Sequence, residues 1–178
     1  SAIQCKTVVD ATGDGDVCKA ACEQTVSLRT NVRAGWFYYF DGRQVRLNPL
    51  SDRMDSLGLK VPGEGRGYAG DDAADVTAQV VDTRRLIRRK CAELKSASPR
   101  NAVCPLFIPS IPDLRMTRRL KGAVELMESD ERRFFPDTIG MTGDWRKSGP
   151  VYYLPLRSML ATQTDNLIAA GRCISAGQ

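Results

Sequence analysis

Short apolar runs that end in turn residues recur along the chain, and this pattern predicts several short strands rather than a helical bundle. Residues 3–9 are rich in β-branched side chains, and residues 10–16 follow with two glycines and three aspartates. Residues 17–24 carry helix-forming and small side chains. The beginning of the chain therefore predicts a strand, a tight loop and a short helix.

Residues 25–50 return to a β pattern. The aromatic run at residues 36–40 ends at Asp41-Gly42, and an Asp-Gly pair between two apolar strands is a strong signal for a tight hairpin. Residues 43–47 are predicted to form the returning strand.

One long helix is predicted in the middle of the chain, after a glycine-rich loop at residues 51–70. Asp71 and Asp72 can cap it, because carboxylates accept hydrogen bonds from the free amides of a helix N-terminus. We expect the helix to end near Leu94. Its apolar positions recur at helical spacing and are Val76, Val80, Val81, Leu86, Ile87, Cys91 and Leu94.

The last third of the chain lacks a second long helical pattern. Residues 98–112 contain four prolines, which predicts extended or irregular backbone. Residues 151–160 and 166–170 are apolar and predict two further strands. The predicted fold class is therefore α/β, with a mixed α+β insertion.

The composition narrows the chemistry that the chain can perform. It has no histidine, which removes the Ser-His-Asp triad and the commonest general base. The six cysteines show no CxxC pair, so we expect six reduced thiols. Cys18 and Cys22 are too few thiolates for a zinc site, and we predict no metal.

Neither a membrane nor a nucleic acid is expected as a partner. No apolar run approaches a membrane span and no signal peptide is visible, so we expect a cytoplasmic protein. Basic clusters at residues 84–90 and 115–121 account for much of the net charge of +5. Aromatic side chains lie away from both clusters, so the stacking surface that single strands require is missing, and solvated helix faces explain the clusters better.

Residues 65–70 match the pattern GxGxxG, which binds dinucleotide phosphates in the right context. That context is a buried strand within a βαβ unit, and residues 56–62 make a poor strand. We interpret residues 65–70 as a flexible loop before the capped helix.

Two apolar strands end in unusual loops near opposite ends of the chain. Residues 7–9 run into residues 10–14, and residues 167–170 run into Gly171-Arg172. Ligands of open α/β sheets lie beyond the carboxyl ends of parallel strands, where glycine lets the backbone approach them. We predict that the two strands are parallel neighbours in one sheet, interrupted by a long insertion.

Four stretches of the chain resemble motifs of FAD-dependent oxidoreductases with two dinucleotide-binding domains. Residues 8–17 are similar to the second motif of the cofactor domain, in which a strand ends in ATGD beside the flavin. The other three occur in the family order and are residues 112–122, 149–158 and 166–176.

The resemblance implies a remnant of a parallel cofactor-domain sheet that is interrupted by a substrate-binding region. Residues 1–24 and 160–178 would be parts of the FAD-binding domain, and residues 25–159 would be the inserted region. The residues that would contact FAD are Thr12, Gly13, Asp14, Gly171 and Arg172. FAD carries the redox chemistry in such proteins, and we assign no general acid or base.

The inserted region would bind a small-molecule substrate. Arginines suggest that this substrate is anionic, because guanidinium groups match carboxylates and phosphates in bidentate fashion. The candidates are Arg115, Arg118, Arg119, Tyr152 and Arg157. The arginines can equally pair with acidic residues of the chain, such as those at positions 128–131.

The resemblance is to an internal piece of such a protein. The glycine-rich pyrophosphate loop would precede Ser1, and a closing helix would follow Gln178. We expect these residues alone to bind FAD weakly or not at all and to be inactive, whereas the full-length protein would be an enzyme that carries FAD. Exposed sheet edges would favour homo-oligomers. The alternative is a non-catalytic anion-binding or interaction module with a basic face.

Overall fold

The computed structural model describes residues 2–31, 36–49, 67–98, 102–108, 110–112, 114–115, 117–144 and 148–177. The chain divides into two compact units. Unit 1 combines Ser1–Leu28 with Arg115–Gln178, and unit 2 is Arg29–Leu114. Helices and strands of both directions occur together, so the predicted mixed α/β class is confirmed.

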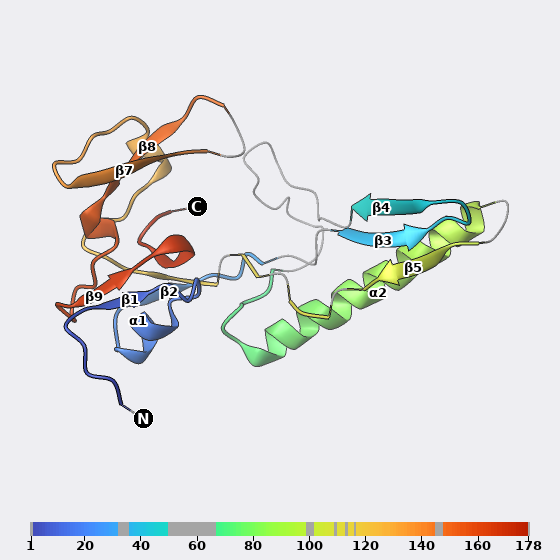
Figure 1. Cartoon of the computed structure of the whole chain (residues 1–178), viewed down its shortest axis with the longest axis horizontal. Helices are drawn as coiled ribbons and strands as arrows, with labels where there is room; N and C mark the ends of the chain where they lie inside the picture. Colours follow the sequence, from blue (N-terminus) through green and yellow to red (C-terminus); the bar gives the residue numbers. More distant parts are fainter. Residues whose placement is uncertain are drawn as a thin grey trace. The chain divides into compact units, whose positions relative to one another are not determined.

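The parallel strand pair predicted from the two ends of the chain is present in unit 1 (Figure 1). Strand β1 (Val8–Asp10) pairs in parallel with β9 (Leu167–Ala169), with Val8 opposite Leu167 and Asp10 opposite Ala169. Both strands are shorter than predicted. Because they run in parallel, their carboxyl ends meet at one edge of the sheet, which we call the carboxyl edge.

Two antiparallel pairs complete the sheets of unit 1. Strand β2 (Thr25–Ser27) pairs with β6 (Arg118–Leu120), and β7 (Thr138–Gly143) pairs with β8 (Val151–Pro155). The strand predicted at residues 151–160 ends early, because Pro155 is followed by a short 3-10 helix whose first amide bonds to the carbonyl of Asp137.

Short helices join the strands of unit 1. They are α1 (Asp16–Ala20), η1 (Glu128–Asp130), η2 (Leu156–Ser158) and η3 (Gly171–Cys173). The buried core of the unit contains Cys18, Leu120, Leu167, Ala169 and Cys173. Burial of these side chains ties α1, β6 and η3 to the parallel pair.

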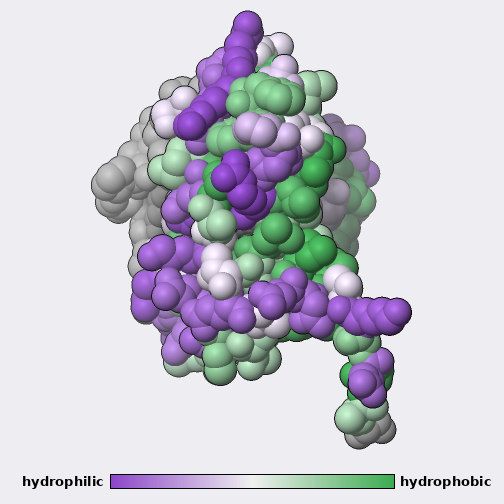
Figure 2. All heavy atoms as spheres, turned by 90° about the vertical axis from the view of Figure 1, so that its left-hand side faces the viewer, coloured by the Kyte–Doolittle hydropathy of each residue, from purple (hydrophilic) through white to green (hydrophobic). Residues whose placement is uncertain are grey.

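Part of the apolar surface of unit 1 remains open. Phe134, Ile139 and Met141 are exposed. Figure 2 views the side of the molecule that carries β7, β8 and β9, and it shows green hydrophobic atoms gathered next to purple hydrophilic ones.

Unit 2 is a three-stranded antiparallel sheet with one long helix. The strand order is β4 (Val45–Pro49), β3 (Trp36–Phe40) and β5 (Cys104–Phe107), and α2 (Ala73–Ala97) packs on it. The predicted hairpin and helix are confirmed, and β5 lies in the segment predicted to be extended.

The helix α2 begins as predicted but buries different residues. Asp72 is its N-cap and accepts a hydrogen bond of 2.7 Å from the amide of Asp75. Its carboxyl half packs Leu86 and Ile87 against Phe37, as the apolar stripe predicts. Its amino half buries the polar side chains Asp75, Gln79 and Thr83, while Val81 is exposed. Val76 and Val80 are half-buried, so the predicted stripe is confirmed only in part for the first half of the helix.

The polar half of α2 has partners in unit 2 that explain its burial. Asp75 accepts hydrogen bonds from Arg29 at 2.6 Å and from the amide of Ala69 at 3.0 Å. The hydroxyl of Tyr68 donates to Asp82 at 2.9 Å. Charged and hydrogen-bonded groups thus replace apolar contacts over these turns.

Most of the predicted loop at residues 51–70, including the first two positions of the GxGxxG match, lies outside the described residues. Gly67 belongs to the described part, and a Cβ added there would overlap the carbonyl oxygen of Arg29. A close approach of two backbone segments therefore accounts for this glycine without any nucleotide.

The compact units differ from the predicted domain boundaries. Unit 1 contains both segments assigned to the FAD-binding domain and also residues 115–159. Compactness does not identify the residues that bind FAD, so the predicted boundaries remain predictions.

Candidate functional site

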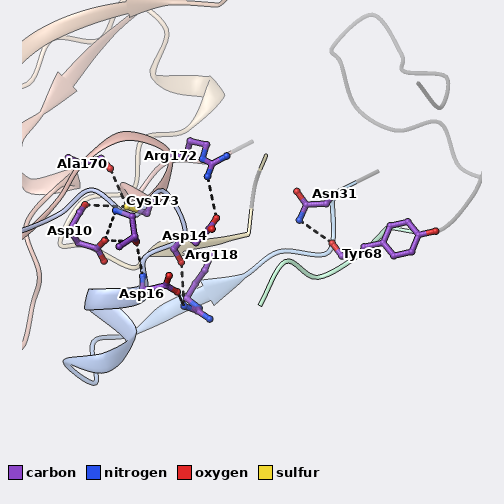
Figure 3. Close-up of polar contacts among 10 residues, drawn as sticks. Asp10, Asp14, Asp16, Asn31, Tyr68, Arg118, Ala170, Arg172 and Cys173 are labelled. Carbon is purple, nitrogen blue, oxygen red and sulfur yellow. Dashed lines mark hydrogen bonds and ion pairs between the residues drawn. The ribbon is translucent and has the colours of Figure 1, made fainter. Parts of the chain in front are cut away.

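The carboxyl edge of the β1–β9 pair brings together the two loops that the sequence predicts to meet. The amide of Ala170 donates to the carbonyl of Asp10 at 2.8 Å, so the pairing continues to the last residue of β1. Beyond it lie residues 11–15 on one side and η3 on the other. Figure 3 shows side chains from both loops in contact.

Asp10 organises the loop that follows β1. Its side chain is fully buried and accepts hydrogen bonds from the amide of Thr12 at 3.1 Å, the hydroxyl of Thr12 at 2.7 Å and the amide of Cys18 at 2.8 Å. Burial acts to raise the pKa of Asp10, but the hydrogen bonds from Cys18 and Thr12 together hold it below its ordinary value. The carboxylate therefore fixes both ends of the loop.

Thr12 and the glycines shape the loop itself. The hydroxyl of Thr12 also accepts a hydrogen bond of 3.1 Å from the amide of Asp16, the first residue of α1. Gly13 and Gly15 have φ angles of +79° and +65°, a region that side chains disfavour. The hydrogen bonds of Thr12 and the positive φ angles of the two glycines therefore account for much of the sequence ATGDGD at residues 11–16.

Gly13, Asp14 and Arg172 are in contact. A Cβ added to Gly13 would lie 2.6 Å from Nη2 of Arg172, and the same nitrogen lies 3.4 Å from Oδ1 of Asp14 (Figure 3). Gly171 has a φ angle of +79°, and a Cβ built there meets no described atom within 4 Å. The backbone at Gly171 is thus open to a ligand.

Arg118 reaches the same loop from β6. Its Nη1 donates to the carbonyl of Asp14 at 3.3 Å and to the carboxylate of Asp16 at 3.2 Å (Figure 3). The side chain is largely buried and residues 118–120 form a strand, so the interpretation of residues 115–121 as a solvated helix face is wrong. Arg118 therefore holds the loop in place, which differs from the substrate-binding role predicted for it, and that role stays untested.

Two buried thiols lie beneath the carboxyl edge. The thiol of Cys173 donates to the carbonyls of Ala170 at 3.3 Å and Asp10 at 3.6 Å. Burial, a hydrogen bond to Asp10 and the charge of Asp10 raise the pKa of Cys18 to about 12. Burial and then the charge of Asp10 also raise the pKa of Cys173. Both thiols are therefore protonated core groups rather than nucleophiles.

The other predicted substrate residues have separate surroundings. Arg157 forms a bidentate pair with Asp137, with Nε and Nη2 at 3.0 and 2.9 Å from its two oxygens. The side-chain and backbone hydrogen bonds from Arg157 lower the pKa of Asp137 to about 2. Arg115 is exposed, and Tyr152 lies in β8 opposite Thr142.

Arg119 is the most unusual of these candidates. Its side chain is 13% exposed, and Nη2 forms an ion pair with Glu125. Its Nε and Nη1 are buried and have no hydrogen-bond acceptor among the described residues. A buried guanidinium normally has its donors satisfied, and Nε and Nη1 point to different sides of the group, so each of the two lacks an acceptor of its own.

Glu23 is a buried residue that the sequence did not point to. Its carboxylate accepts hydrogen bonds from the amides of Thr162 at 3.1 Å and Gln163 at 3.2 Å, in the turn before β9. Burial acts to raise its pKa, but hydrogen bonds from residues 162–164 outweigh it and lower the pKa. Since these partners are about 140 positions away in the sequence, no local pattern reveals the contact.

Two further observations bear on ligands. In the described part of the chain, no helix is long and apolar enough to cross a membrane. Within the same residues, no group of three or more His, Cys, Asp or Glu side chains is arranged to hold a metal ion.

The groups at the carboxyl edge fit FAD. The open backbone of Gly171 and the guanidinium of Arg172 suit a phosphate, and the carboxylate of Asp14 can accept hydrogen bonds from sugar hydroxyls. The parallel strand pair places this unit in the α/β class, whose open sheets bind ligands at the carboxyl edge.

Comparison with known proteins gives the family within that class. A family model described as FAD dependent oxidoreductase matches residues 39–178, which is more than half of the chain, so the chain belongs to this family. No curated protein and no solved structure matches it. The family implies FAD as the cofactor of the full-length protein. The match extends through residues 39–100, where the sequence showed no motif, and residues 8–17 lie outside it.

Proposed function

We propose that this chain provides the substrate-binding region and part of the FAD site of a flavin-dependent oxidoreductase. The observation that carries the proposal is the parallel pairing of β1 with β9, because it brings Gly13 and Arg172 together from opposite ends of the chain. FAD, when bound, supplies the redox chemistry.

Each residue at the carboxyl edge has its own role in binding FAD. Thr12 and Gly13 give the loop a shape that leaves its backbone near the ligand, and Asp14 accepts hydrogen bonds from hydroxyl groups. Gly171 and Arg172 hold a phosphate or the ribityl chain. Asp10 and Arg118 position the loop through the hydrogen bonds described above.

The substrate is a small anionic molecule in this proposal, and Arg119 is its strongest contact. Arg157 is held by Asp137 and Arg118 by Asp16. The Nε and Nη1 groups of Arg119, by contrast, are buried without an acceptor among the described residues. Leaving charged donors unsatisfied is costly, and an anionic oxygen at Nε or at Nη1 would satisfy one of them. Arg115 and Tyr152 remain secondary candidates.

Flavin absorbance of the natural chain that contains these residues tests the cofactor site. We expect bound flavin after purification and about tenfold weaker FAD binding in Arg172→Ala, which corresponds to about 1.4 kcal/mol. Arg85→Ala is the matched control, since it removes an exposed arginine of α2. A colourless natural chain that still binds anions would favour the non-catalytic alternative.

Small carboxylates and phosphate test the substrate site separately. In the flavin-loaded protein, acetate, succinate or phosphate should perturb the flavin spectrum, and Arg119→Gln should abolish the effect while flavin content is unchanged. An unchanged anion response in Arg119→Gln would exclude Arg119 as the anion contact without affecting the cofactor assignment.

A further inference from the structure

The central strand of unit 2 is apolar on both of its faces. Phe37 and Tyr39 of β3 point toward α2 and pack in the core. Because side chains alternate along a strand, Trp36, Tyr38 and Phe40 point to the opposite face. A strand with large apolar side chains on both faces is typical of a sheet that is covered on both faces.

The neighbouring strands continue this second face. In the register of the sheet, Leu47 and Phe107 lie opposite Tyr38, and Val45 lies opposite Phe40. Residues opposite each other in an antiparallel pair share a face. We call the set the open face, and it consists of Trp36, Tyr38, Phe40, Val45, Leu47 and Phe107, which are between 39% and 58% exposed.

The open face is suited to a protein partner rather than to a small molecule. None of its six residues is charged. Each of the four aromatic and two aliphatic side chains is about half exposed and leaves on the order of 100 Å² open, so the face amounts to roughly 600 Å². That area is at the upper end of the largest apolar patches on ordinary monomers, and such patches are often functional. The hollow of unit 2 lined by Asn48, Lys90, Glu93, Leu94 and Ala97 lies at the α2 side of the sheet.

Charge and area together favour a second copy of the chain as the partner. Two open faces would bury roughly 1,200 Å², the lower limit of stable specific interfaces. The sheet lies between this face and the cation-rich half of α2, which carries Arg84, Arg85, Arg88 and Arg89 (Figure 1). Face-to-face packing of two sheets about 10 Å apart therefore leaves the basic helices on opposite outer sides.

We propose that the chain forms a symmetric dimer in which the open faces of two copies pack against each other. The interface is isologous, since each copy contributes the same surface. This differs from the self-association through sheet edges expected from the sequence, because edge pairing would leave the aromatic face in water. The proposal is independent of the flavin site.

The test is the mass of the natural chain in solution, measured by sedimentation and light scattering over a range of concentrations. The unaltered protein is expected to be a dimer that dissociates at micromolar concentration. Leu47→Lys and Val45→Lys each place a charge on the open face and should give monomers. Met141→Lys is the matched control, because Met141 of β7 is 66% exposed and lies in unit 1, and it should remain dimeric.

Far-UV circular dichroism shows whether each variant keeps the helix content of the unaltered protein and is therefore folded. Folded monomers of both lysine variants, with a dimeric Met141→Lys, support the proposal. A monomeric unaltered protein overturns it. The proposal is also overturned if both lysine variants remain dimeric. It is overturned as well if both variants become monomeric but lose helical signal, because the open face is then needed for the fold of one chain and is covered within it.

Discussion

A Cβ added to Gly13 would lie 2.6 Å from Nη2 of Arg172, although the two residues are far apart in the sequence. Gly13→Ala is therefore expected to displace the Arg172 side chain from Asp14 as well as strain the backbone, whose φ angle is +79°. The strain costs about 1–2 kcal/mol, and moving the end of a flexible arginine adds little to it. Urea unfolding measures this cost, and FAD titration measures the effect on the site.

Gly149→Ala is the matched control for this variant. Gly149 also has a positive φ angle, +111°, but its added Cβ meets no described atom within 4 Å, and it lies outside the proposed FAD site. Both variants should lose similar stability. Adding Arg172→Ala should weaken FAD binding less in the Gly13→Ala background than in the control background. Equal effects of Arg172→Ala in the two backgrounds would contradict the contact.

Asp10→Asn should destabilise unit 1 although it preserves shape. Asp10 accepts hydrogen bonds on both carboxylate oxygens, from Thr12 and from Cys18. An amide places an NH₂ group against one of these donors and leaves it unsatisfied, which costs about 2–3 kcal/mol. The urea midpoint gives the loss. Asp14→Asn, at the same loop but more exposed, is the control and should change stability far less.

The parts of the molecule that the sequence predicted are those set by local chemistry. The Asp-Gly hairpin after Phe40 and the Asp72 cap follow from residues next to each other. The β1–β9 pairing was predictable from strand ends and from the family resemblance. The burial of Asp75 in α2 was not, because its partner Arg29 comes from a distant segment. The Glu23 contact with residues 162–164 was missed for the same reason.

Stability should fall in acid because of Asp10 and Glu23. Hydrogen bonds lower the pKa of both folded carboxylates below their ordinary values of 3.8 and 4.5. Since the folded pKa values are depressed, the stabilisation is complete above about pH 4.5 and is lost as the pH falls through the folded values. Urea midpoints at decreasing pH should decline less steeply in Glu23→Gln. An identical decline in that variant would exclude Glu23 as a source of the effect.

The Asp137–Arg157 pair predicts a titration that can be followed directly. Arg157 lowers the pKa of Asp137 to about 2. Arg157→Gln removes the positive charge and the two-pronged side-chain hydrogen bond to Asp137 but keeps the backbone hydrogen bond, so the pKa of Asp137 should rise toward 3.8. Carboxyl NMR measures this shift. Arg133→Gln, which removes the partner of Asp130, is the control and should leave Asp137 unchanged. An Asp137 that already titrates near its ordinary value would contradict the pairing.

Thiol reagents should separate the six cysteines by their surroundings. Cys18 and Cys173 are buried, and the pKa of Cys18 is raised to about 12, so neither forms a thiolate near neutral pH. Cys5, Cys22 and Cys104 are exposed and should react at once, and Cys91 is half-buried and should react more slowly. We therefore expect the folded chain to protect Cys18 and Cys173, and the denatured chain to release all six thiols without reductant. Mass mapping after brief maleimide treatment identifies the sites.

The Asp10→Asn variant sharpens the test, because it removes the charge that helps to keep both buried thiols protonated, while burial remains. Protection that persists in this variant would assign the effect to burial, whereas selective labelling of Cys18 would show that the Asp10 loop had opened. Early labelling of Cys173 in the unaltered protein would contradict the β1–β9 core itself.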